Sequence, residues 1–258
     1  MIKELWDYRE LLITNTKKAI RGKYKASVLG VLWSFINPLL QILVYAIVFP
    51  YLMRGAIDNY LVYLVTGIIP WTFFTNVIND CVGCVKNNSG LIKKVYFPRI
   101  ILPLSAAFSG LFNFFVSCII IVVFCLLWGV GISWHIVILP IIALIETILA
   151  LGLGLIMGAC DADVQDLEYI TGFILQMAFY GTPIIYSLEQ FATATSILVT
   201  MVKLNPVTTI MNSYRDIFLY HQIPDMTALG FVFLVSMIIL ILGILVFKKL
   251  EKGFAEQF

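Results

Sequence analysis

Long apolar stretches recur along the chain, and their lengths predict membrane-spanning helices. A helix that crosses about 30 Å of hydrocarbon needs about 20 mostly apolar residues. Six stretches meet this requirement, at about 29–52, 60–82, 100–128, 135–157, 169–186 and 226–247. We therefore predict an all-α integral membrane protein with six transmembrane helices.

The segment between the fifth and sixth stretches, about 187–225, has a different pattern. Two apolar pieces, about 192–202 and 207–220, flank the sequence from Lys203 to Pro206, and each is too short to cross a bilayer. A single span through both would bury a lysine and a helix-breaking Asn205-Pro206 pair. A re-entrant helical hairpin fits better, and it implies a polar cavity because lipid tolerates such backbone only against protein or water.

The N-terminal residues predict an amphipathic helix that lies in the membrane interface. Apolar side chains between Ile2 and Ile20 fall on one arc at 100° per residue, and most charged side chains fall opposite. Residues 1–28 are thus expected to form a cytoplasmic interface helix, and residues 29–258 the transmembrane domain. Small residues at Ala150, Gly154 and Gly158 let another helix approach closely, and packing within the chain is favoured over a subunit interface.

The cations sort to one side of the predicted spans. The N-terminal segment, the loop after the second span and the C-terminus hold most of the 17 lysines and arginines. The positive-inside rule makes that side cytoplasmic, so both termini are expected in the cytoplasm. Apolar residues are 61% of the chain and charged residues 12%, which agrees with membrane insertion.

Motifs for catalysis and for metal binding do not occur in the sequence. It has no Gly-x4-Gly-Lys-Ser/Thr phosphate loop, no paired-histidine motif and no Gly-x-Ser-x-Gly elbow. We therefore expect no catalytic residue, no metal site, no cofactor in this chain and no nucleic-acid partner. Cys81 and Cys84 have no nearby histidine in sequence, which favours small buried thiols over zinc ligands. Glu146 lies deep in the fourth span, where a hydrogen-bonded structural role is favoured over a proton relay.

Two segments carry polar or aromatic residues that plain membrane spans do not require. Asn37-Pro38 interrupts the first span, either to open backbone toward a polar path or to kink the helix for packing. The loop KNNSGLIKKVYFPR, residues 86–99, sets Tyr96 and Phe97 beside lysines and an arginine. A snorkelling loop explains the cations, whereas exposed aromatics are typical of a docking surface for another protein.

Five stretches, in this order, resemble the permease subunits of ABC exporters that move lipid-linked polysaccharides, the family of O-antigen, capsule and teichoic acid exporters. They read KYKASVLGVLWSFINPLL (23–40), GIIPWTFF (67–74), LIKKVYFPRIILPLS (91–105), TPIIYS (182–187) with LNPVTTIMNSYRDIF (204–218), and FKKLEKGFAE (247–256). One position departs from the family. After the fourth span, where the family usually has Asn, three residues and Arg-Asp, this chain has Asp161 and Gln165-Asp166.

The resemblance implies a channel subunit in the bacterial plasma membrane that moves an undecaprenyl-diphosphate-linked polymer out of the cytoplasm. It implies a homodimer with two copies of a separate ATPase subunit, which would bind ATP and Mg, and an N-terminal gate helix. The alternative is an ABC exporter of a small lipid or drug. A secondary carrier is disfavoured because neither inverted repeats nor further buried charge is present, and a membrane enzyme because no catalytic set is present.

The resemblance also implies roles for three groups of residues. A substrate entrance that attracts the lipid diphosphate would include Arg21, Lys23, Tyr24, Lys25 and Trp33. The cations of that group have an alternative role in fixing orientation and binding anionic lipid. An ATPase docking surface would include Leu91, Lys93, Lys94, Tyr96, Phe97 and Arg99. The outer end of a channel would be lined by the re-entrant segment with Asn205, Pro206, Tyr214 and Arg215.

Overall fold

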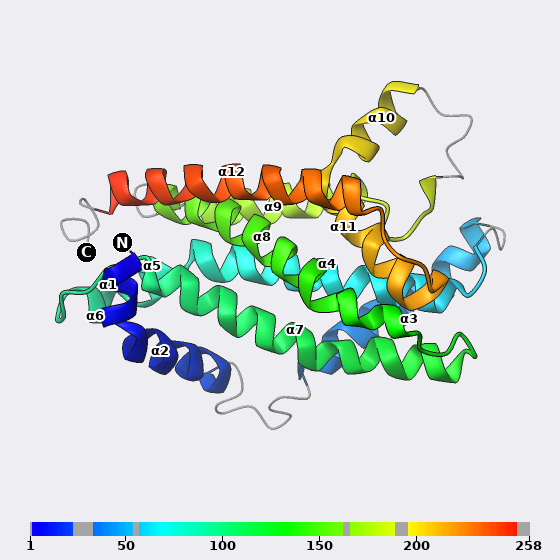
Figure 1. Cartoon of the computed structure of the whole chain (residues 1–258), viewed down its shortest axis with the longest axis horizontal. Coiled ribbons are helices and arrows are strands. Elements are labelled where there is room, and N and C mark those ends of the chain that lie inside the picture. The colour runs from blue at the N-terminus through cyan, green and yellow to red at the C-terminus, as the bar shows by residue number, and fades with distance from the viewer. Residues whose placement is uncertain (1, 23–32, 54–56, 162–165, 189–195, 252–258) are drawn as a thin grey trace.

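The computed structural model describes residues 2–22, 33–53, 57–161, 166–188 and 196–251. These residues are predominantly helical and contain no strand, so the predicted all-α class is confirmed. The bundle is elongated, and its long helices run roughly along the same axis (Figure 1).

The helices follow one another in a simple order. The first are α1 (Ile2–Asp7), α2 (Arg9–Gly22), α3 (Trp33–Met53), α4 (Tyr60–Val82), α5 (Cys84–Asn87), α6 (Ser89–Ile92) and α7 (Ile101–Leu127). A 3-10 helix, η2 (Trp134–Ile138), leads into α8 (Leu139–Asp161). The rest are α9 (Leu167–Tyr180), α10 (Ser196–Leu204), α11 (Pro206–Arg215), a π-helix η4 (Asp216–Tyr220) and α12 (Met226–Leu250).

Four helical segments of the described residues are long and apolar enough to cross a membrane: α4, α7, η2 with α8, and α12. The first predicted span appears as α3, whose residues Phe35–Val48 form a shorter apolar stretch. The fifth predicted span is shorter than expected, because α9 ends at Tyr180 rather than near residue 186. Gly181 caps it and Pro183 follows, and proline disfavours helix in the residue before it. The total of six spans stays a prediction.

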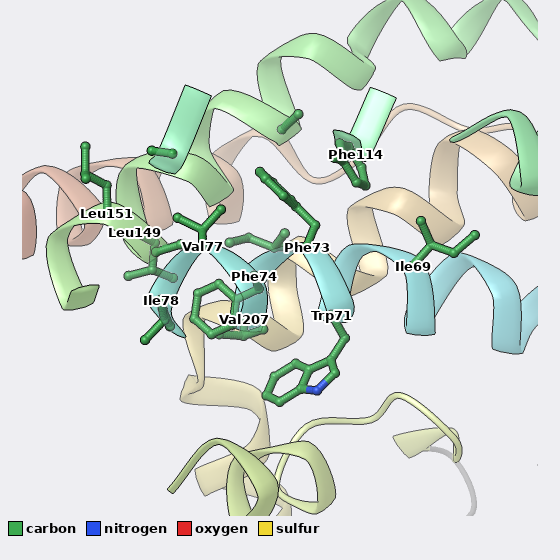
Figure 2. Close-up of a cluster of buried hydrophobic side chains, with 14 of the residues drawn as sticks. Ile69, Trp71, Phe73, Phe74, Val77, Ile78, Phe114, Leu149, Leu151 and Val207 are labelled. Carbon is green, nitrogen blue, oxygen red and sulfur yellow. The ribbon is translucent and has the colours of Figure 1, made fainter. Parts of the chain in front are cut away.

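Helix α4 forms the centre of the bundle and contacts α3, α7, α8, α9 and α11. Its aromatic side chains fill the spaces between these neighbours (Figure 2). The rings of Phe73 and Phe114 stack with centroids 4.6 Å apart, which joins α4 to α7. The Trp71 ring meets Phe179 of α9 edge-on at 5.8 Å. Such ring pairs contribute about 0.5–1.5 kcal/mol beyond the area that they bury.

Glycines set the spacing between α8 and its two main neighbours. A Cβ atom added at Gly158 would lie 2.6 Å from the Cys81 carbonyl oxygen of α4, and one at Gly154 would lie 2.6 Å from the Cys81 Cβ. The predicted packing role of this small-residue stripe is thus confirmed within the chain. On the side facing α12, a Cβ at Gly243 would lie 2.6 Å from the Gly152 carbonyl oxygen. These distances require glycine because any larger side chain pushes the helices apart.

The predicted hairpin between the last two spans is a pair of short helices, α10 and α11. In Figure 1, α10 projects from the bundle, whereas α11 packs against it and contacts α4, α8 and α12. Asn205 caps α11 by accepting a hydrogen bond from the Val207 amide at 3.0 Å, and Pro206 takes the first helical position. This Asn-Pro start is a preferred beginning of a helix because it satisfies one free amide and removes another.

Glu146 of α8 is completely buried and holds α11 in place. The Tyr214 hydroxyl donates a hydrogen bond of 2.7 Å to Glu146 Oε2. The predicted hydrogen-bonded role of Glu146 is therefore confirmed. Because Tyr214 has no exposed surface either, the bond ties the short helix to the transmembrane core.

The N-terminal residues form two helices rather than one, with a break at Tyr8. Half-buried Leu5, Leu11 and Leu12 pack on the core, and α2 contacts α7. Residues 23–28 of the predicted interface segment lie outside the described residues. Figure 1 places α1, α5, α6 and the end of α12 at one end of the bundle, which agrees with the predicted sorting of cationic segments.

Replacing Gly243 of α12 with alanine is expected to destabilise the protein by about 1–3 kcal/mol, the usual cost of overpacking. The new methyl group would meet the Gly152 carbonyl oxygen in the backbone of α8. Gly230→Ala in the same helix is the matched control, since a Cβ there meets nothing within 4 Å. Thermal unfolding of the purified protein in detergent measures both. Equal melting temperatures for the two variants would contradict the close packing.

Tyr214→Phe is expected to lower stability by about 1–3 kcal/mol because it leaves the buried Glu146 carboxyl without its hydrogen-bond donor. Tyr169→Phe, at a tyrosine that is highly exposed on α9, is the control for loss of a hydroxyl group alone. The same unfolding assay applies. The double variant Glu146→Leu/Tyr214→Phe should recover part of the loss, since both polar partners are then gone. If the double variant recovers no stability, the two side chains do not stabilise the protein as a hydrogen-bonded pair.

Candidate functional site

A cavity of about 300 Å³ with several amide and hydroxyl side chains in its wall lies between α3, α4 and α7, and we call it the mid-bundle cavity. Its lining consists of Trp33, Asn37, Pro38, Ile69, Thr72, Phe73, Asn76, Gly110, Asn113, Phe114 and Ser117. Amide and hydroxyl side chains are costly in the middle of apolar spans unless they find polar partners or water. Their gathering in the wall of one cavity gives each of them polar neighbours or access to water.

The mid-bundle cavity explains one sequence feature and adds others. Asn37 and Pro38 lie in its wall, which agrees with the first of the two interpretations of this pair, although α3 stays helical through the proline. Sequence reasoning missed Asn76 and Asn113, which bring two further amides from separate helices. The sequence does contain a signal for both residues, because each is an amide within a long apolar stretch.

A larger polar pocket of about 880 Å³, the hairpin pocket, is lined by residues from the end of the bundle opposite α1 and the end of α12 (Figure 1). It lies between the start of α4, the segment after α9, the hairpin helix α11 with η4, and the start of α12. Its lining consists of Ile57, Asp58, Tyr63, Pro183, Ser187, Leu188, Thr209, Asn212, Ser213, Arg215, Asp216, Tyr220, Gln222, Asp225 and Ala228. The cavity that the hairpin pattern implied is therefore present.

Arg215 is 1% exposed and is held firmly in the wall of the hairpin pocket. Its Nη2 donates to the Ile184 carbonyl at 2.9 Å, and its Nη1 donates to Asn212 Oδ1 at 3.2 Å. Its Cζ atom lies 3.6 Å from the centre of the Tyr63 ring, a cation–π contact. A Cβ at Gly67 would lie 2.9 Å from Nη2, so glycine leaves room for the guanidinium.

The other predicted residues of the re-entrant segment do not line the pocket. Tyr214 points into the core, where it binds Glu146. Asn205 caps α11 and donates from Nδ2 to Thr182 Oγ1 at 3.0 Å, which ties the hairpin to the segment after α9. Of the four predicted residues, Arg215 is thus the one that lines the pocket, and the others position its helix.

Five of the six predicted docking residues, all except Leu91, line a small pocket of about 260 Å³ next to α6. Lys93, Lys94 and Arg99 line it, and Tyr96 is 93% exposed. The expectation that Phe97 is an exposed anchor is wrong, since this side chain is 4% exposed and belongs to the core. Leu91 is half-buried against the same core. The apolar groups of this loop therefore fix its position, and Tyr96 with the cations forms its surface.

The predicted entrance residues are described only in part. Arg21 is exposed near the end of α2, and Trp33 lines the mid-bundle cavity. Lys23, Tyr24 and Lys25 lie outside the described residues. A further cavity of about 520 Å³ lies between α2, α4, α5 and α7. Its lining consists of Asn15, Lys18, Ala19, Gly22, Asp80, Cys84, Asn87, Asn88, Leu102, Ser105 and Ala106. In the sequence, Lys18 belongs to the charged face of the amphipathic helix, and this pattern is the signal by which its place in the cavity lining could have been found.

Comparisons with known proteins identify the family. Residues 10–219 match the ABC-2 type transporter family. The chain is 33% identical to the O-antigen export system permease protein RfbA of Myxococcus xanthus, over 100% of this chain and 98% of that protein. It is 32% identical to the protein of the same name from Klebsiella pneumoniae, over 96% of this chain and 94% of the relative.

A more distant relative extends the comparison. The chain is 21% identical to the polysialic acid transport protein KpsM of Escherichia coli, over 92% of each chain. The matches run through the spans, the loop after α4 and the hairpin helices rather than through one short motif. With similarity of this extent, the chain belongs to the ABC-2 type transporter family.

Proposed function

We propose that this chain is the membrane-spanning subunit of an ABC exporter that moves a lipid-linked polysaccharide, of the undecaprenyl-diphosphate type, across the bacterial inner membrane. The observation that carries the proposal is the full-length similarity to a protein named as an O-antigen export permease. The relatives found are named for O-antigen or polysialic acid transport, which favours a polysaccharide over a small lipid or drug.

The mid-bundle cavity and the hairpin pocket support a transport role, because both contain polar side chains. A hydrated polymer needs amide, hydroxyl and aromatic side chains along its path, because weak and repeated contacts bind it without trapping it. The mid-bundle cavity supplies three asparagines, and the hairpin pocket supplies polar groups at the far end. In this proposal, the hairpin helices border the outer end of the path.

The energy for transport is proposed to come from a separate ATPase subunit, which binds ATP and Mg. Two copies of the chain would pair as a homodimer with two ATPase subunits, and both termini would face the cytoplasm. The end of the bundle that holds α5 and α6 also holds the exposed Tyr96 and its neighbouring cations. An exposed aromatic among cations suits a protein contact, so we assign ATPase docking to this surface.

At the entrance, Arg21, Lys23 and Lys25 are proposed to draw the lipid diphosphate toward Trp33. Charge-assisted hydrogen bonds from arginine and lysine to phosphate are short and strong. A second role in binding anionic lipid uses the same charges.

Deletion of the gene tests the proposed function directly. We expect the deletion strain to lose a surface polysaccharide and to accumulate its lipid-linked precursor inside, with both restored by the intact chain on a plasmid. The polysaccharide is measured by extraction and gel electrophoresis of surface glycans. Unchanged surface polysaccharide in the deletion strain would reject the function.

Replacing Lys94 with glutamate and Tyr96 with alanine is expected to reduce recovery of the ATPase with the tagged chain at least about tenfold, a loss of about 1.4 kcal/mol. Lys203→Glu, an exposed lysine in the hairpin at a distance from this loop, is the matched charge reversal and should leave recovery unchanged. Phe97→Ala should instead lower the melting temperature, because it creates a core cavity. Full ATPase recovery with the Lys94 and Tyr96 changes would refute the docking surface.

A further inference from the structure

The hairpin pocket gathers charged groups from separate parts of the chain. Asp58 precedes α4, Asp216 begins η4 after the hairpin helix, and Asp225 caps α12. Arg215 is the one cationic residue in the lining. The pocket's volume of about 880 Å³ falls in the range of sites that bind small molecules, about 300–1,000 Å³.

Arg215 supplies the second observation that points to a ligand. Two of its nitrogens are paired, but its Nε atom has no partner although the side chain is almost completely buried. A buried donor left unpaired is costly, so such groups are rare in folded proteins. The Ile184 carbonyl, Asn212 and the Tyr63 ring hold the guanidinium rigidly in the wall. The guanidinium is therefore held in a fixed orientation in the wall of the pocket.

The remaining lining is rich in groups that recognise hydroxyls. Carboxylate oxygens accept strong hydrogen bonds from ligand O–H groups, and the amides of Asn212 and Gln222 both donate and accept. Tyr220 adds a half-exposed aromatic ring. A ligand with many hydroxyl groups on a partly apolar ring uses all of these features.

The charges decide which ligands fit. Three carboxylates against one guanidinium give the pocket a negative balance, which disfavours a second anion in the same space. A bound divalent cation does not explain them, because no three His, Cys, Asp or Glu side chains in the described part of the chain gather closely enough to hold a metal ion. The pocket chemistry instead suits an uncharged polyhydroxylated ligand.

We propose that the hairpin pocket is a saccharide-binding site that accepts neutral sugar residues and disfavours sugars that carry carboxylates. The inference rests on the proposed function, and it names the class of sugar that the outer end of the path selects. Arg215 and the lining amides contact ring and hydroxyl oxygens, while Asp58 and Asp225 accept hydrogen bonds from hydroxyls and repel acidic sugars.

The test uses the full chain with its ATPase in lipid nanodiscs and two soluble probes, maltotetraose and a tetrasaccharide of galacturonate. Saturation-transfer NMR and titration calorimetry measure their binding. We expect maltotetraose to bind at least about tenfold more tightly than the acidic probe, a difference of about 1.4 kcal/mol. The double variant Asp58→Asn/Asp225→Asn should bring the two affinities within about threefold, or about 0.65 kcal/mol.

These variants leave the fold intact. Asp58 is exposed, and asparagine at position 225 keeps the cap that now accepts hydrogen bonds from the amides of Thr227 and Ala228. Asp166→Asn, an exposed acid before α9, is the matched control and should bind both probes like the unmodified protein.

Equal binding of the two probes by the unmodified protein, or no binding of either, would overturn the saccharide site. So would unchanged discrimination in the double variant. The gene deletion separates this failure from that of the proposed function. Loss of surface polysaccharide together with absent probe binding rejects the site alone, whereas an unaltered surface rejects the transport role itself.

Discussion

Hydrocarbon offers no hydrogen bonds, so a polar group inside this bundle is costly unless it finds a partner within the protein or faces a polar cavity. This constraint explains the most buried contacts in the structure. Glu146 receives the Tyr214 hydroxyl at 2.7 Å, and Arg215 donates to the Ile184 carbonyl at 2.9 Å. Both contacts join a long helix or its flanking segment to the short helix α11. The polar groups thus fix the short helix α11 against the longer helices of the bundle.

The helices at the centre of the bundle pack closely, whereas other helices bury less of their surface against that centre. Helices α4, α8 and α12 approach through glycines such as Gly152 and Gly243, at distances that exclude any side chain. Helix α9, by contrast, leaves most of its apolar side chains exposed. A rigid centre that carries α11 on hydrogen bonds, beside helices with open apolar faces, suits a subunit that must contact lipid and further chains.

Aromatic contacts lie between the mid-bundle cavity and the hairpin pocket. Phe73 and Phe114 line the mid-bundle cavity and stack on each other, and Phe114 meets the Tyr214 ring edge-on at 5.6 Å. Tyr214 precedes Arg215, which lines the hairpin pocket. Packed side chains of this kind transmit a conformational change from one cavity to the other only where a structural element can adopt two conformations. The π-helix η4, next to Arg215, is a type of irregularity that is frequent at functional sites.

The sequence by itself determined the all-α membrane class, the short paired helices around Asn205-Pro206, the stripe of small residues and the resemblance to polysaccharide permeases. These depend on local signals, namely apolar length, capping residues and motifs. Only the tertiary structure decided that Phe97 is buried, that Asn76 and Asn113 share a cavity, and that Tyr214 turns to the core while Arg215 faces the pocket. Those outcomes depend on which helices are neighbours, and a linear pattern of apolar residues contains no such information because every span looks alike to lipid.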